Sequence, residues 1–175
     1  MKITQCKSKK QSGMTLMEMI ASLSILAIVV VGALALFGGA SSSQSSTAAL
    51  RDLIAIRSGG QSLFIGQGSY GTTSMNQALI TAKKVPSTMT VSGTTISTVW
   101  GGTVTVTGNT TNFTIQMTAL TADVCAALVS NATTGWSSVT IGSTVMSTFP
   151  ISPNVAGDST HCGAAPVNVT WTTSS

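Results

Sequence analysis

The longest uninterrupted apolar stretch of the chain lies near its N-terminus. Residues 19–37 (MIASLSILAIVVVGALALF) carry no charge, and no later segment approaches this length of apolar sequence. As a helix, nineteen residues at about 1.5 Å each span roughly 28 Å, close to the roughly 30 Å thickness of a bilayer's hydrocarbon layer. Lysines precede the stretch, so the positive-inside tendency keeps the N-terminus cytoplasmic and sends the remainder across the membrane.

A second helical pattern follows this apolar stretch. Apolar residues lie largely along one side of residues 47–57, namely Leu50, Leu53, Ile54 and Ile56. We therefore expect one long helix over residues 14–58, with a weak joint at residues 38–39, where two glycines cost roughly 2 kcal/mol relative to alanines. A plain coil over residues 38–46 is the alternative.

The remainder, residues 59–175, is expected to form a globular head. Alternating apolar segments between glycine turn signals predict strands at residues 89–91, 96–100, 103–107, 113–118, 138–141, 144–147 and 167–172. Short helices are expected over residues 72–83, capped by Thr73 or Ser74, and directly after Thr121. The buried face of the second short helix is predicted to be Val124, Cys125, Leu128 and Val129. The fold class is thus α+β, with a long N-terminal helix packed on a C-terminal antiparallel β-sheet head.

Composition and charge narrow the classes of function. Only 7% of the 175 residues are charged, against roughly 25% in ordinary soluble domains. The net charge of +4 arises in the first ten residues, which hold four lysines, because four basic side chains balance four acidic ones in the rest of the chain. The body of the protein lacks the basic surface that nucleic-acid binding requires, so no nucleic-acid partner is expected.

Some residue patterns suggest chemistry that their context does not support. The G-x-G-x-x-G motif of residues 66–71 follows a predicted helix and is not followed by an acid about 20 residues later, which favours a turn over a phosphate cradle. His161 lies beside Asp158 and Ser159 without a G-x-S-x-G elbow, which argues against a catalytic triad. One histidine and two distant cysteines do not make a zinc site. We expect no enzyme activity, no metal and no cofactor. The three tryptophans fall in or beside apolar strands, which favours core or interface packing over sugar binding.

The residues just before the apolar stretch form a processing motif. A lysine pair, Gly13, Met14 and Glu18 stand in this order ahead of the hydrophobic helix. The arrangement resembles the processing site of type IV prepilins, in which a membrane peptidase cuts after the glycine and methylates the new N-terminus. The resemblance implies a cut between Gly13 and Met14, so that residues 1–13 are a leader and 162 of the 175 residues remain.

Glu18 is the only acid in the apolar part of the helix. A carboxylate in apolar surroundings is costly unless it is paired, and the released amine of Met14 on a neighbouring subunit is a suitable partner. Such a pair would select one axial stagger between helices that otherwise slide easily in lipid. A side chain that merely snorkels to the membrane interface is the alternative.

Further stretches of the chain resemble one subgroup of this family. They are FIGQGSYG (64–71), KKVPSTM (83–89), VWGGTVTV (99–106), FTIQMTALTADVCAAL (113–128), and Cys162 with the VNVTW that follows it. They are similar to class b pilins of the bundle-forming and conjugative thin-pilus type.

Two cysteines remain after the implied cut. Cys125 and Cys162 lie on the exported side of the membrane, where disulfides persist. A bond between them would be worth roughly 3 to 4 kcal/mol in the chain-entropy account. Two buried free thiols are the alternative.

The expected function is that of the major structural subunit of a class b pilus. The resemblance implies self-assembly into a helical homopolymer through the N-terminal helix, with the prepilin peptidase and the inner-membrane assembly machinery as further partners. The chain would lie in the bacterial inner membrane before assembly and in an extracellular pilus after it. The filament would serve adhesion, aggregation or conjugative mating contact with a host-cell or recipient-cell surface. The alternative is a minor or tip pilin that acts as a membrane-anchored binding module.

Overall fold

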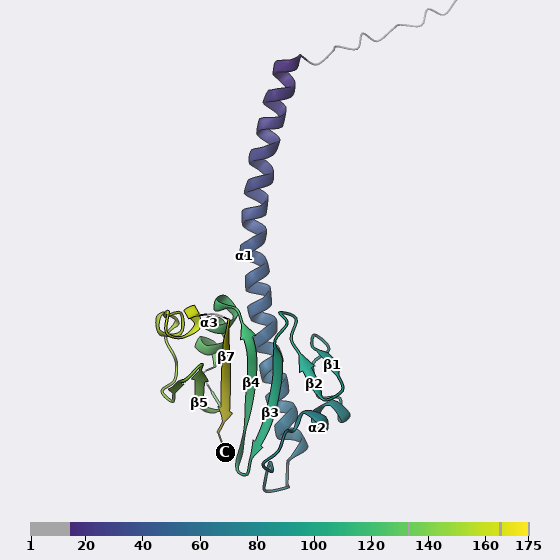
Figure 1. Ribbon diagram of the computed structural model, residues 1–175, viewed down its shortest axis with the longest axis vertical. Helices are drawn as coiled ribbons and strands as arrows, with labels where there is room; N and C mark the ends of the chain where they lie inside the picture. Colours follow the sequence, from purple (N-terminus) through teal and green to yellow (C-terminus); the bar gives the residue numbers. More distant parts are fainter. Residues whose placement is uncertain (1–14, 133, 165, 175) are drawn as a thin grey trace, which may run out of the picture. The chain divides into compact units, whose positions relative to one another are not determined.

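The computed structural model describes residues 15–132, 134–164 and 166–174 (Figure 1). The chain divides into two compact units, Met1–Ala40 and Ser41–Ser175. Helix α1 (Leu16–Leu63) begins in the first unit and ends in the second. Its backbone is helical throughout residues 38–46, so the alternative of a coil there is wrong.

The head unit is built on a seven-stranded sheet. Its strands are β1 (Thr90–Ser92), β2 (Thr95–Ser97), β3 (Thr103–Asn109), β4 (Asn112–Leu120), β5 (Trp136–Ile141), β6 (Thr144–Met146) and β7 (Val167–Thr173). They lie in the order β1-β2-β3-β4-β7-β5-β6, and every neighbouring pair is antiparallel. The last strand along the chain therefore lies inside the sheet, between β4 and β5 (Figure 1). The predicted antiparallel sheet is confirmed.

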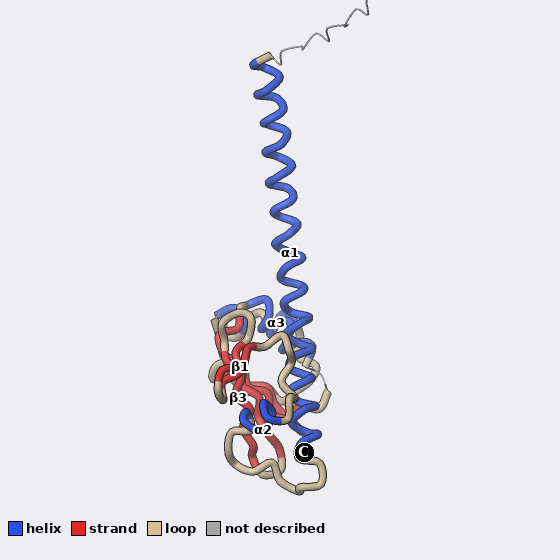
Figure 2. The backbone as a smooth tube through the Cα atoms, turned by 90° about the vertical axis from the view of Figure 1, so that its right-hand side faces the viewer, coloured by secondary structure: helices blue, strands red, loops and turns tan. Residues whose placement is uncertain are grey.

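One face of the sheet is covered by helices. The residues of α1 that belong to the head run along this inner face (Figure 2), and Ala49, Leu53 and Ile56 are fully buried there. Strand residues alternate between the buried inner face and an outer face rich in threonine, as apolar–polar alternation with a period of two requires. Helix α3 (Ala122–Asn131) adds the predicted face to the core, namely Val124, Cys125, Leu128 and Val129.

Helix α1 differs from its prediction in two respects. The sequence predicts Ile54 on the apolar side, but 54% of it is exposed, because the buried side is formed by Ala49, Leu53 and Ile56. The helix also passes the predicted end at residue 58 and continues to Leu63. Gly60 lies so close to the core that an added Cβ would stand 3.0 Å from Cζ of Phe113. Glycine here permits close packing against β4 and does not end the helix.

Helix α2 (Asn76–Thr81) is shorter than predicted, because the residues before it continue the edge of β3. Met75 N–H donates to the Val106 carbonyl (2.8 Å), and Asn76 continues this pairing with its side chain. Asn76 Oδ1 accepts from Val106 N–H at 2.8 Å, and Nδ2 donates to the carbonyls of Val104 (3.0 Å) and Thr94 (3.3 Å). The buried amide thus supplies hydrogen-bond partners to backbone groups of β3 at the point where the pairing of β3 with β2 ends.

A cation–π contact joins α1 to the start of β5 within the head. The Arg57 guanidinium lies 4.9 Å from the ring centroid of Trp136, and Nη1 donates to the Thr134 carbonyl at 3.1 Å. Gly135 has a φ of +77°, and a Cβ there would collide with the guanidinium, so this turn requires glycine. Trp136 and Trp171 are buried, in agreement with packing rather than sugar binding.

A disulfide ties the segment between β6 and β7 to the rest of the head. This segment contains α4 (Pro153–Ala156) and the 3-10 turn η1 (Cys162–Ala164). Cys162 is bonded to Cys125 of α3, with the two Cα atoms 5.5 Å apart and both side chains fully buried.

Candidate processing and assembly site

The described part of the N-terminal unit begins just after the predicted cleavage position. Gly13 and Met14 lie outside the described residues. Glu18 lies in the first turn of α1, where its negative charge complements the helix dipole, and its side chain is exposed. Its backbone N–H donates to the Thr15 carbonyl at 3.0 Å.

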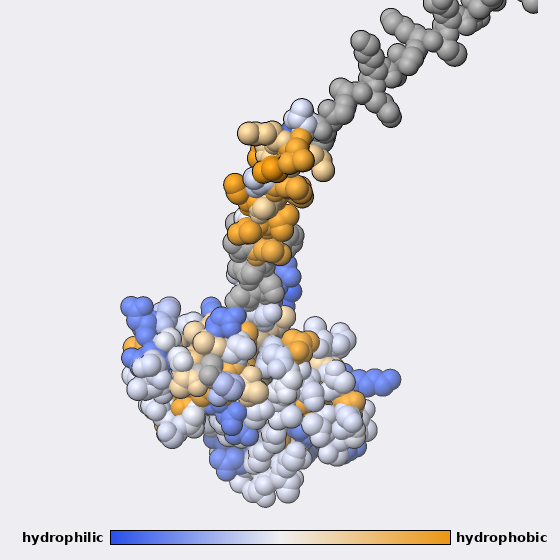
Figure 3. All heavy atoms as spheres, turned by 45° about the horizontal axis from the view of Figure 1, so that its top comes forward, coloured by the Kyte–Doolittle hydropathy of each residue, from blue (hydrophilic) through white to orange (hydrophobic). Residues whose placement is uncertain are grey.

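The helix that follows Glu18 presents apolar side chains in every direction. Residues Leu16–Leu34 have a mean hydropathy of 2.3 and are long and apolar enough to cross a membrane. None of this stretch is buried within the chain, and its large apolar side chains are 48–83% exposed. Figure 3 shows mostly apolar residues on the visible face of this segment. A helix that is apolar all round needs lipid or other helices around it.

The hydroxyl groups of this segment are satisfied by its own backbone. Ser22 Oγ donates to the Met19 carbonyl at 2.9 Å, and Ser24 Oγ donates to the Ile20 carbonyl at 2.8 Å. These bonds lower the cost of placing serine in an apolar environment. Glu18 is then the one charged side chain in residues 16–34 that requires a partner or water.

The Ser-His-Asp neighbours form a local turn. Asp158 Oδ1 accepts from Thr160 N–H (2.8 Å), from Thr160 Oγ1 (2.9 Å) and from Ser159 Oγ (3.4 Å). The bonds from Thr160 hold the pKa of Asp158 below its ordinary value. His161 Nδ1 contacts Thr160 Oγ1 at 3.2 Å, so the carboxylate and the imidazole share Thr160 and do not form the relay of a triad.

The glycine motif forms the loop between α1 and α2. Gly66, Gly68 and Gly71 all have positive φ values, and a Cβ on any of them would meet open space. The Tyr70 ring lies between those of Phe64 and Phe113, with centroids 5.6 and 4.9 Å away. The motif therefore shapes a turn, and it follows a helix rather than the strand that a dinucleotide site needs. Among the described residues, no group of three or more His, Cys, Asp or Glu side chains could hold a metal ion.

Two families match different parts of the chain. The PilS N terminal family matches residues 43–174, most of the chain. The prokaryotic N-terminal methylation motif matches residues 8–34, which include Gly13, Met14 and Glu18. No curated protein matches the chain.

The fold is also found in a solved pilin. The crystal structure of type IV b pilin from Salmonella typhi is similar with a TM-score of 0.58 and 17% sequence identity, and the match covers 71% of this chain and 97% of that one. At this identity the likeness concerns the fold, and the family match carries the assignment. Together these findings confirm the resemblance drawn from the sequence: the chain belongs to the PilS N terminal family, carries the prokaryotic N-terminal methylation motif and has the fold of a type IV b pilin.

Proposed function

We propose that this chain is the major structural subunit of a type IV b pilus. The observation that carries the proposal is the segment Leu16–Leu34, which is apolar, exposed all round and charged only at Glu18. Before assembly, the inner membrane would cover this surface. In a filament, the same surface would be covered by the corresponding helices of neighbouring subunits.

Processing would convert the membrane protein into a subunit ready for assembly. A prepilin peptidase would cut after Gly13 and methylate the amine of Met14. Residues 1–13 would leave as the leader, the first part of α1 would serve as the membrane and filament helix, and the unit from Ser41 onward, which contains the rest of α1, would form the head. The match of the methylation motif to residues 8–34 supports the leader and the apolar helix that follows it.

Glu18 would then control assembly. Near the membrane interface, water and lipid headgroups can solvate its carboxylate, so insertion does not require a protein partner. Inside a bundle of helices without water, the charge needs a cation. The released amine of Met14 on the adjoining subunit would supply it, and inner-membrane assembly machinery would move the subunit from lipid to filament.

Replacement of Glu18 tests the proposal. We expect Glu18→Gln and Glu18→Ala chains to be produced, cleaved and retained in the membrane, yet to give few or no filaments. The matched control is Ser22→Ala, one turn further along the helix, which should assemble like the wild type. The measurement is the ratio of sheared surface filament to membrane-held subunit, by immunoblot. Wild-type yields from both Glu18 variants would mean that Glu18 only snorkels to the interface.

The low charge of the head suits the role of major subunit, because lateral packing of many heads tolerates few like-charge contacts. The pilus would serve adhesion, aggregation or mating contact with a host or recipient cell. The composition of purified filaments distinguishes a major subunit from a minor or tip pilin. This chain should dominate them, whereas a trace amount would indicate the minor role.

A further inference from the structure

Both edges of the head sheet have unpaired backbone groups. Strand β1 pairs only with β2, and strand β6 pairs only with β5. Within residues 15–132, 134–164 and 166–174, no backbone hydrogen bond connects the outer edge of either strand to another part of the head. Unpaired N–H and C=O groups along an edge are a template for a strand from another chain.

Neither edge carries the side chains that usually block such pairing. The sequences are Thr-Val-Ser in β1 and Thr-Val-Met in β6, without charge or proline. Val91 in β1 is 40% exposed and Val145 in β6 is 65% exposed. Proteins commonly protect edges with lysine, proline, bulges or short strands, and here only the short length applies.

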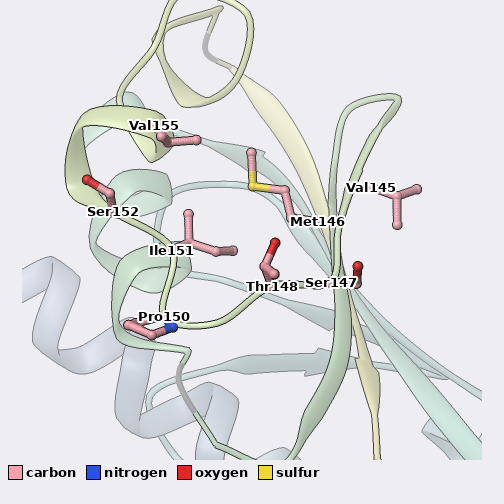
Figure 4. Close-up of a pocket in the computed structure, with 8 residues that line it drawn as sticks. All are labelled: Val145, Met146, Ser147, Thr148, Pro150, Ile151, Ser152 and Val155. Atoms are coloured by element: carbon pink, nitrogen blue, oxygen red, sulfur yellow. The ribbon is translucent and has the colours of Figure 1, made fainter.

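A hollow lined by both apolar and hydroxyl side chains lies beside β6 (Figure 4). It has a volume of about 400 Å³, lies between β6 and the segment that leads to α4, and is lined by uncharged residues. In Figure 4, Met146 is directed towards Ile151 and Val155, while Val145 lies on the other side of the strand. The remaining lining residues are Ser147, Thr148, Pro150 and Ser152.

The register places Val91 and the hollow on the same face of the sheet. Met146 pairs with Val139, which is buried on the inner face, so Met146 lies on the inner-face side of β6. Val91 pairs with Ile96, which is likewise buried on the inner face. If β1 of a second subunit paired with the free edge of β6, Val91 of that subunit would lie beside Met146 and face the hollow.

Strand direction is also compatible with this arrangement. Six antiparallel steps separate β1 from β6, so the alternation along the sheet gives the two edge strands the same sense, to which the twist of the sheet adds a rotation. Subunits of a helical filament share one polarity, because a rotation and a translation along one axis relate them. The β1 edge of one head can therefore meet the β6 edge of the next as a parallel pair, with both inner faces on the same side. Such a head-to-tail contact builds an open filament.

We propose that β1 of one subunit docks beside β6 of the next copy of this chain, with Val91 inserted into the hollow formed by Met146, Ile151 and Val155. The proposal rests on the proposed function, since it requires filaments of identical subunits. It adds a specific head-to-head contact to the contacts between N-terminal helices.

Cross-linking between engineered cysteines tests the contact. The full-length chain would carry Val91→Cys and Met146→Cys. Cys6, which lies in the predicted leader, would be replaced by serine so that it adds no free thiol, and sheared filaments would be treated with a short bismaleimide. Within one head the two edges lie about 29 Å apart, six strand spacings of about 4.8 Å, so the linker can join only different subunits. We expect a ladder of covalent dimers, trimers and larger species, and no ladder from either single variant.

A matched pair controls for chance encounters. Ile65→Cys with Met146→Cys combines β6 with a residue that is 79% exposed in the loop after α1, and it should give no ladder. Filaments of the Val91/Met146 pair that show no ladder would overturn the inference and leave the proposed function standing. A cell surface without filaments of the wild-type chain would instead refute the proposed function.

A charge at the edge gives a second, independent measurement. Val91→Lys should lower the ratio of surface filament to membrane-held subunit about tenfold or more, because the hollow offers no carboxylate to an inserted ammonium group. Val99→Lys is the control, since Val99 lies outside the strands and is 71% exposed. Wild-type filament yield from Val91→Lys would contradict the contact.

Discussion

Replacement of Asn76 by alanine should be among the most damaging single changes to the head. The Asn76 side chain accepts one hydrogen bond from Val106 N–H at 2.8 Å and donates one to the Val104 carbonyl at 3.0 Å. Val104 is 1% exposed and Val106 is fully buried, so water does not readily replace the amide. A buried backbone group without a partner costs about 1–3 kcal/mol, so two such groups imply a loss of about 2–6 kcal/mol. Whole domains are stable by only about 5–15 kcal/mol.

Urea denaturation of the full chain in detergent, followed by tryptophan fluorescence, measures this loss. All three tryptophans belong to the head, and the fully buried Trp171 makes the signal sensitive to its unfolding. Gln77→Ala is the matched control, because the neighbouring amide is exposed and bonds only to Thr81 within α2. It should change the free energy of unfolding by less than about 0.5 kcal/mol. Equal unfolding midpoints for the Asn76 and Gln77 variants would refute the reasoning.

Three further changes have definite expected results. Gly13→Val should leave the leader attached, because a peptidase cleft fitted to a residue without Cβ has little room for valine; the intact mass of the membrane-held chain reports this, and a cleaved variant would contradict it. Cys125→Ala with Cys162→Ala should lower the free energy of unfolding by about 3 to 4 kcal/mol, and an unchanged urea midpoint would contradict the role of the bond. Burial raises the pKa of Asp52 although Thr88 donates to its carboxylate. The folded state therefore holds the Asp52 proton more tightly than the unfolded state, and the stability that this gives in acid is lost as the pH rises through the folded-state pKa. Asp52→Asn should flatten that part of the pH profile of the free energy of unfolding and should raise this free energy at neutral pH.

Local patterns in the sequence were sufficient for much of the fold. The buried face of α3 follows from a helical period, and the strands of the sheet follow from alternation between glycine turns. The apolar segment near the N-terminus needs no tertiary information, because length and the absence of charge define it. These elements were predicted within a few residues of their observed bounds.

Features that depend on distant contacts could not be predicted in this way. The position of β7 between β4 and β5 joins segments far apart in the sequence, and no local pattern encodes that order. Asn76 reads as an ordinary helix residue, yet it completes the edge of β3 because β2 ends early. Gly60 reads as a helix terminator, yet it is needed where α1 approaches Phe113. The exposure of Ile54 likewise depends on which side of α1 meets the sheet.

The hollow beside β6 also could not be predicted from the sequence. Its lining comes from β6 and from the segment around α4, which only tertiary packing brings together. The segment is held to α3 by the bond between Cys125 and Cys162. The sequence predicts the two short, uncharged strands. It does not show that they form the two edges of the sheet, which is what makes them available for pairing with another chain.

The intact mass of the subunit in purified surface filaments tests the central claim most directly. The account predicts that this chain dominates the filaments as a 162-residue species that begins at Met14, carries a methylated amine and gains the mass of two hydrogens on reduction of its disulfide. The assignment as a processed major subunit would be contradicted by filaments that contain the full 175-residue chain, or by filaments in which this chain is present only in traces.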